Sequence, residues 1–197
     1  MQQPADRWNQ HVVLHPSDRL FLAVVAPCIP KSVRPNHLTG LRVALVPFVI
    51  FFLHAERYGV SGAIFFIAAL TDWFDGALAR SRRQITEWGI IYDPLADKLL
   101  IGAALFMIVL EHVNFFLGIA LLVIECGLIA AGLYARLKGV VEPANVWGKI
   151  KMVAEVVGVL LLLFALWQKI DLFVNLSTGM LAFALIAALV SIYSRIR

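Results

Sequence analysis

The sequence is poor in charged side chains: lysine, arginine, aspartate and glutamate together make up 15% of its 197 residues. A typical soluble domain has about 25% charged and about 45–50% apolar residues, whereas this chain is 61% hydrophobic. This shortage excludes an ordinary soluble domain and predicts an integral membrane protein. The formal net charge of +4 suits basic residues held at the cytoplasmic side of a bilayer, so we expect no nucleic-acid partner.

Cysteine is almost absent, and Cys28 and Cys126 stand far apart. They match no zinc or redox spacing, so we expect neither a disulfide framework nor a cysteine metal site. Residues 1–10 are polar and no apolar run of suitable length follows them directly, so we expect no signal peptide. We find no internal repeat, and the length suits one domain.

Long hydrophobic runs, by contrast, are frequent. A helix needs about 20 mostly apolar residues to cross the hydrocarbon core of a bilayer, and six segments reach or approach this length. They are residues 38–54, 59–79, 91–110, 113–136, 148–168 and 172–193. The short connections favour antiparallel neighbours. The predicted fold is therefore an all-α polytopic membrane protein, with six transmembrane helices over residues 35–197.

Residues 1–34 are expected to form a cytoplasmic and interfacial N-terminal segment. Ser17 or Asp18 can cap a short helix over residues 20–26, which is too short to span and which Pro27 would end. We interpret it as an interfacial helix on the cytoplasmic surface. A buried strand or a loose arm remains as the alternative.

The distribution of basic residues predicts the orientation. If the N-terminus is cytoplasmic, all of the 17 lysines and arginines except Arg57 and Lys169 fall in cytoplasmic segments or at cytoplasmic helix ends. This positive-inside asymmetry, with an even number of spans, places both termini in the cytoplasm. In a bacterium the membrane would be the inner membrane.

Four aspartates interrupt the apolar segments. Asp72 and Asp75 are three residues apart, and Asp93 and Asp97 are four apart, so each pair shares one helical face. Pro94 fits the first turn of a helix, so the third helix is expected to begin close to it. Four carboxylates in a small, low-dielectric volume need cations to stay ionised. Their hard oxygens favour Mg²⁺, Mn²⁺ or Ca²⁺, and two such cations can hold a diphosphate.

Two alternatives compete with this metal site. Pairing with arginines at helix ends explains one aspartate more easily than four on two matched stripes. An ion-coupled transporter is the stronger rival, because acids inside a membrane mark ion pathways. Transport sites, however, lie near the bilayer midplane between repeats. These acids lie at one edge, beside arginines that suit phosphates, namely Arg80, Arg82 and Arg83.

This stretch resembles the signature of the CDP-alcohol phosphotransferase family. It reads Asp72-x-x-Asp75-Gly76-x-x-Ala79-Arg80 and then, eight residues later, Gly89-x-x-x-Asp93-x-x-x-Asp97. The resemblance implies an enzyme of phospholipid biosynthesis that transfers phosphatidyl from CDP-diacylglycerol to an alcohol and releases CMP. It implies a homodimer, two Mg²⁺ or Mn²⁺ ions and a base, Asp97. The implied metal ligands are Asp72, Asp75, Asp93 and Asp97.

The resemblance also implies contacts with the CDP moiety. The matching residues of the signature are Asp75, Gly76, Ala79 and Arg80. A second segment, residues 34–39 continuing to Arg42, resembles the Pro-Asn-x-Leu-Thr sequence that lies near the nucleotide in many members, and it adds Asn36 and Thr39. Capping of a helix by Asn36 explains the same residue equally well.

The acceptor is indicated by residues 92–98 and 148–151, which resemble phosphatidylglycerophosphate synthases and related cardiolipin synthases. This implies sn-glycerol 3-phosphate, with its phosphate on Arg136, Lys149 and Lys151; lysines that snorkel to the interface are the alternative.

Three departures from the synthase pattern keep two other acceptors open, namely an unphosphorylated alcohol or phosphatidylglycerol itself. Ile124 precedes Glu125 where the synthases usually carry an arginine, and Met152 and Glu155 stand where they usually carry threonine and glutamine. Glu125 pairing with a lysine inside the cavity is a further hypothesis.

Overall fold

The structure is a computed structural model, and it describes the backbone of residues 35–82, 87–137 and 145–196 together with most of their side chains. The predicted N-terminal segment and its interfacial helix lie outside the described residues.

All regular secondary structure in the described ranges is helical. One rod is continuous through a π-helical turn: α5 (Glu87–Ala104) leads through η2 (Leu105–Val109) into α6 (Leu110–His112). The other helices are α3 (Pro35–His54), α4 (Tyr58–Arg82), α7 (Phe115–Leu137), α8 (Val146–Gln168) and α9 (Asp171–Ile196). Each of the six predicted apolar segments lies within one of these rods, give or take a few residues.

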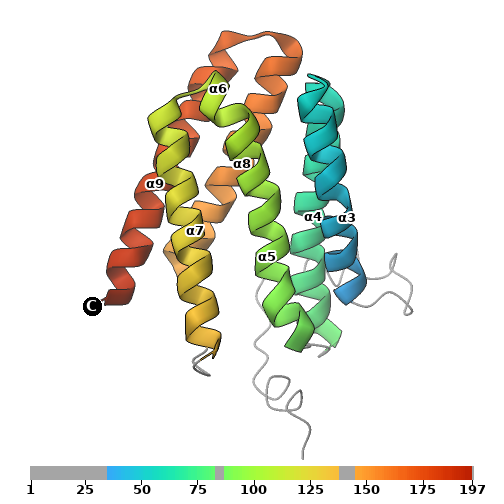
Figure 1. Cartoon of the computed structure of the whole chain (residues 1–197), viewed down its shortest axis with the longest axis vertical. Helices are drawn as coiled ribbons and strands as arrows, with labels where there is room; N and C mark the ends of the chain where they lie inside the picture. The colour runs from blue at the N-terminus through green and yellow to red at the C-terminus, as the bar shows by residue number, and fades with distance from the viewer. Residues whose placement is uncertain (1–34, 83–86, 138–144, 197) are drawn as a thin grey trace, which may run out of the picture.

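The rods run alternately up and down, so the start of α3 and the end of α9 lie at the same end of the bundle (Figure 1). Polar residues set the turns. Asn145 caps α8 by accepting a hydrogen bond from the Trp147 N–H at 3.1 Å. Lys169 ends the same helix in the left-handed conformation, at φ 58°. The left-handed backbone at Lys169 lets the chain turn directly from α8 into α9, which begins at Asp171.

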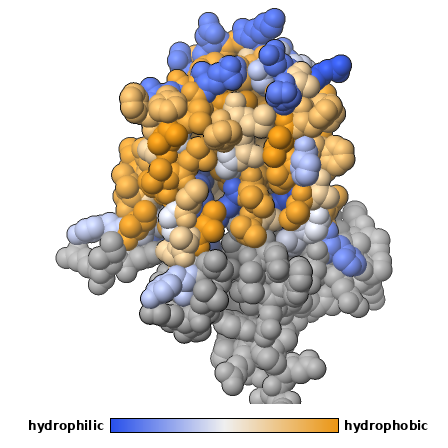
Figure 2. All heavy atoms as spheres, viewed as in Figure 1, coloured by the Kyte–Doolittle hydropathy of each residue, from blue (hydrophilic) through white to orange (hydrophobic). Residues whose placement is uncertain are grey.

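Four of the described helices are long and apolar enough to cross a membrane. Their candidate spans are His37–His54, Phe115–Gly132, Val146–Gln168 and Asp171–Ser194, and α4 contributes a shorter apolar stretch, Tyr58–Phe74. On the face shown in Figure 2, apolar side chains form a broad band, and hydrophilic ones gather at the end that holds the α3–α4 and α8–α9 turns. The described chain is thus that of an all-helical polytopic membrane protein.

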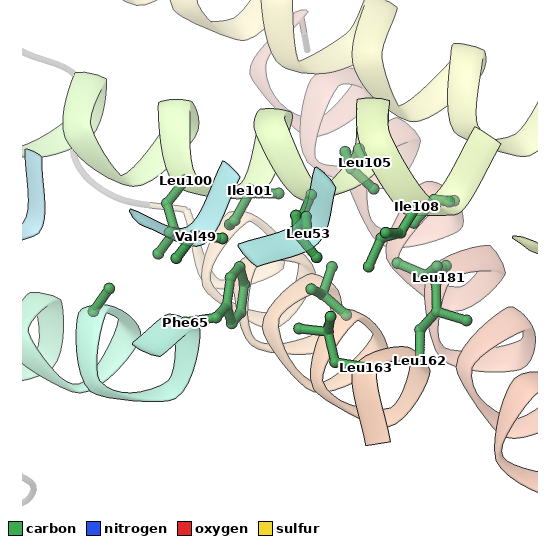
Figure 3. Packing of buried hydrophobic residues seen from close by; sticks show 14 of the residues in the cluster. Val49, Leu53, Phe65, Leu100, Ile101, Leu105, Ile108, Leu162, Leu163 and Leu181 are labelled. Atoms are coloured by element: carbon green, nitrogen blue, oxygen red, sulfur yellow. The ribbon is translucent and has the colours of Figure 1, made fainter. Parts of the chain in front are cut away.

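The core joins the rods into one bundle. Helix α3 packs on α4, α8 packs on α9, and α5 bridges α3 and α7. Buried apolar side chains from α3, α4, α5, α7, α8, α9 and η2 form one cluster. Figure 3 labels ten of them: Val49, Leu53, Phe65, Leu100, Ile101, Leu105, Ile108, Leu162, Leu163 and Leu181. Since lipid is as apolar as these side chains, tight packing is what stabilises the bundle.

The expected start of the third helix was wrong. Helix α5 begins at Glu87, so Pro94 lies well inside it instead of in its first turn. A proline in a helix interior removes one backbone hydrogen bond. Membrane helices tolerate this where neighbouring helices or polar groups satisfy the freed carbonyl, so Pro94 is a poor boundary marker in this setting.

Substituting Gly158 is expected to destabilise the α8–α9 hairpin. The Gly158 carbonyl accepts a hydrogen bond from Ser177 Oγ at 2.7 Å, and a Cβ at this position would lie 2.9 Å from Cγ and Cδ2 of the fully buried Leu181. We expect Gly158→Val to lower the free energy of unfolding by about 1–3 kcal/mol, as overpacking usually does. Thermal unfolding in detergent measures this.

The matched control is Gly127→Val at an exposed position of α7, where an added Cβ would meet no atom within 4 Å. An unfolding midpoint for Gly158→Val equal to that of the control would contradict the close packing of α8 on α9.

Candidate active site

Helices α3 and α4 bring Arg42 and Asp72 together. Arg42 Nη1 lies 2.8 Å from Asp72 Oδ1, with the arginine side chain fully buried and the aspartate side chain 23% exposed. Thr39, also buried, lies one turn before Arg42 on the same face of α3. A buried guanidinium is stable only when it is paired. This pair therefore fixes Asp72 toward the interior and not toward lipid.

Asp97 reaches the same region from α5. It is half-buried and close enough to Asp72, Arg42, Lys98 and Lys151 to interact with all four electrostatically. The structure thus brings together Asp72 and Asp97, one from each of the two predicted acidic stripes.

The other predicted metal ligands, Asp75 and Asp93, lie in α4 and α5, but their side chains lie outside the description. Among the side chains that are described, no three His, Cys, Asp or Glu residues cluster closely enough to hold a metal ion. The two described aspartates, Asp72 on α4 and Asp97 on α5, supply carboxylate oxygens. These are the donors that Mg²⁺ and Mn²⁺ prefer. The described half of the predicted set therefore fits the chemistry of a hard divalent cation.

A second set of charges joins α5, α7 and α8. Glu125 Oε2 lies 2.8 Å from Lys98 Nζ, and Glu125 Oε1 contacts Lys151 Nζ. Lys151 also pairs with Glu155 on its own helix, at 3.2 Å. The hypothesis that Glu125 pairs with a lysine is confirmed, and it pairs with two. We call Lys98, Glu125, Lys151 and Glu155 the four-charge cluster.

The predicted acceptor residues do not all lie together. Lys151 is buried in the four-charge cluster, whereas Lys149 is exposed. Side chains two positions apart on a helix point to nearly opposite sides. Arg136 lies in α7, with its side chain outside the description.

The predicted CDP contacts divide in the same way. Thr39 is described and buried. For the others the structure gives only a place in a helix: Asn36 in α3, and Asp75, Gly76, Ala79 and Arg80 in α4.

The sequence pattern predicted no ion pair for Arg42, which it placed only at the end of the segment near the nucleotide, and it gave Lys98 no site role. A signal for Arg42 was present: it follows Thr39 by three residues and so shares its face, inside an apolar segment. Lys98 directly follows Asp97. A charged residue on the inward face of a membrane helix marks function as strongly as an acid does.

Buried acids and bases inside a bundle of apolar helices are typical of a polytopic membrane protein with a functional polar site. The sequence profile of the family described as CDP-alcohol phosphatidyltransferase matches residues 32–191. The chain belongs to this family, and it is therefore a transferase.

Individual relatives agree with the profile. The chain is 34% identical over 171 residues to the CDP-diacylglycerol--glycerol-3-phosphate 3-phosphatidyltransferase of Haemophilus influenzae, an alignment that covers 83% of this chain and 89% of the relative. The protein of the same name from Bacillus subtilis is 37% identical over 145 residues, covering 66% and 75%. That of Salmonella typhimurium is 51% identical over 81 residues, covering 40% and 44%.

Proposed function

We propose that this protein transfers the phosphatidyl group of CDP-diacylglycerol to sn-glycerol 3-phosphate and releases CMP. The observation that carries the proposal is the meeting of Asp97 with Asp72 and Arg42 between α3, α4 and α5. The names of two similar relatives, from Haemophilus influenzae and Bacillus subtilis, describe the same transfer.

The reaction needs a base beside a phosphorus atom. The acceptor hydroxyl oxygen bonds to the phosphorus that carries diacylglycerol, and the bond from that phosphorus to the CMP oxygen breaks, with its electrons leaving on CMP. Asp97 accepts the hydroxyl proton. The fully buried Arg42 side chain orients Asp72 through their ion pair.

Asp72, Asp75, Asp93 and Asp97 would hold two divalent cations, Mg²⁺ or Mn²⁺. When bound, these ions supply positive charge that neutralises the diphosphate. The partial burial of Asp72 and Asp97 near each other supports this assignment, since two close carboxylates repel each other in a low dielectric without added cations.

The nucleotide end would lie along α3 and the end of α4. We assign its contacts to the predicted set: Asn36, Thr39, Asp75, Gly76, Ala79 and Arg80. The buried position of Thr39, one turn from Arg42, supports this.

The acceptor phosphate is assigned to Arg136, Lys149 and Lys151, with Lys98 added by the structure. Lys98 and Lys151 both interact electrostatically with Asp97, so an anion held there would present its hydroxyl to the base.

The topology of the proposal has six spans, an interfacial N-terminal helix and both termini in the cytoplasm of a bacterial inner membrane, as a homodimer. The proposed chain has two parts: a cytoplasmic and interfacial N-terminal segment, residues 1–34, and a transmembrane catalytic domain, residues 35–197. The alternation of the rods in Figure 1 supports it, since Arg57 and Lys169 lie in turns at one end of the bundle.

CMP release by the purified protein in mixed micelles with CDP-diacylglycerol and Mg²⁺ or Mn²⁺ tests the acceptor. The panel is sn-glycerol 3-phosphate, phosphatidylglycerol, inositol phosphate, inositol, serine and glycerol. We expect release with sn-glycerol 3-phosphate and little with the others. Release with phosphatidylglycerol alone would instead identify a cardiolipin synthase-type enzyme.

A further inference from the structure

The four-charge cluster contains two glutamates, although Glu125 alone pairs with both of its lysines. Glu125, 3% exposed, already bridges Lys98 and Lys151 across three helices. Glu155, 1% exposed, adds a second carboxylate to Lys151 from one turn further along α8. Two lysines and two glutamates make the cluster formally neutral, so neither ammonium charge is left over for a ligand.

Glu155 is also incompletely satisfied. Its Oε2 pairs with Lys151, while its Oε1 is buried with no hydrogen-bond partner among the residues described. An ionised carboxylate buried in this way is costly unless its surroundings compensate it. A buried acid with one bare oxygen is a poor structural support, which suggests that its place is kept for function.

The cluster also adjoins the reacting centre. Lys98 follows Asp97 in α5, and Lys151 and Glu155 both interact electrostatically with Asp97. Lys151 is therefore within reach of an acceptor phosphate whose hydroxyl lies at Asp97. A phosphate bound there would compete with the Glu155 carboxylate for the same Lys151 ammonium.

We propose that Glu155 is a specificity-determining residue that competes with the acceptor phosphate for Lys151. The inference rests on the proposed function. In the acceptor-free enzyme the Glu155 carboxylate pairs with the Lys151 ammonium. An acceptor phosphate must displace this carboxylate and is repelled by its negative charge. Glu155 thus weakens the binding of phosphorylated acceptors relative to uncharged ones, while Glu125 keeps both lysines in place.

The isosteric change Glu155→Gln tests this competition. It removes the competing charge without changing size, so we expect the KM for sn-glycerol 3-phosphate to fall about tenfold, a typical effect of relieving one close like-charge contact. The KM for CDP-diacylglycerol should move much less. A purely supporting role for Glu155 predicts the opposite sign, because an unsupported Lys151 would bind the acceptor less well.

Two further variants sharpen the test. Glu111→Gln makes the same chemical change at an exposed position at the other end of the α5–η2–α6 rod and should leave the acceptor KM unchanged. In the double variant Glu155→Gln/Lys151→Met the decrease in acceptor KM should vanish, because the Lys151 ammonium that Glu155→Gln frees is no longer there. Glu125 still pairs with Lys98 in this variant. An acceptor KM that rises or stays constant in Glu155→Gln would overturn the proposal.

Binding of inorganic phosphate separates this inference from the proposed function. In metal-free buffer, the phosphate concentration that raises the unfolding temperature should be about tenfold lower for Glu155→Gln than for the wild type. Equal responses would overturn the competition even if the enzyme accepts sn-glycerol 3-phosphate. A wild type that releases no CMP with that acceptor would refute the proposed function alone, and the phosphate titration would still decide the role of Glu155.

Discussion

Replacing Asp97 with asparagine is expected to lower kcat for CMP release by about a thousandfold or more, within the range that general base catalysis contributes. Asparagine has the same shape but cannot accept the proton of the acceptor hydroxyl. It also removes one negative charge from the place where Asp72 and Asp97 meet. The measurement is single-acceptor CMP release at saturating CDP-diacylglycerol and metal, with the variant shown to elute and unfold as the wild type does.

Asp171→Asn is the matched control for this experiment. Asp171 is exposed in the first turn of α9, at the end of the bundle away from Asp97, and asparagine serves equally well near a helix start. Its activity should equal that of the wild type. An Asp97→Asn protein that retains more than about a tenth of wild-type kcat would exclude Asp97 as the base, because removing such a base costs at least about a hundredfold.

The sequence predicts the helices of this protein well because hydrophobic length is a local property. Each apolar segment lies in a rod of α3 to α9, and the two acidic stripes predict that Asp72 and Asp97 face one volume. Spacing along one helix determines which residues share a face. Only the assignment of that face to the interior needed the structure.

The ion pairs were harder to predict, since they depend on how separate helices are rotated and staggered. Arg42 is 30 positions from Asp72, and Lys98 is 27 positions from Glu125. Nothing in a single sequence measures such distances in space. The error at Pro94 has a related cause: the rule for proline in a helix is local, whereas a membrane helix can tolerate an interior proline through its packing against other helices.

The arrangement of bases around the site explains why so acidic a stretch can enter a membrane at all. Two described carboxylates of the site pair with a cation from another helix: Asp72 with Arg42 from α3, and Glu125 with Lys151 from α8. Assembly of the bundle and compensation of its charges are therefore one event. A substitution in the site should be tested together with its partner, so that lost folding is not mistaken for lost chemistry.

The variants of Asp72 and Arg42 apply this principle to the metal. We expect Asp72→Asn to raise the concentration of Mn²⁺ needed for half-maximal activity about a hundredfold, the upper end of what weakened ligation costs. It also reduces the compensation of the buried Arg42 charge, so the variant should unfold at a lower temperature. A Mn²⁺ titration of CMP release gives the first quantity, and thermal unfolding gives the second.

The double variant Arg42→Gln/Asp72→Asn separates the two effects. Removing both charges should restore much of the stability, because no charge is then left with less compensation than before, while the Mn²⁺ requirement should stay high. Arg42→Gln alone keeps the carboxylate and removes a competing cation, so it should need no more Mn²⁺ than the wild type. If the titration of Asp72→Asn coincides with that of the wild type, Asp72 holds no metal, and its pair with Arg42 serves only to join α3 to α4.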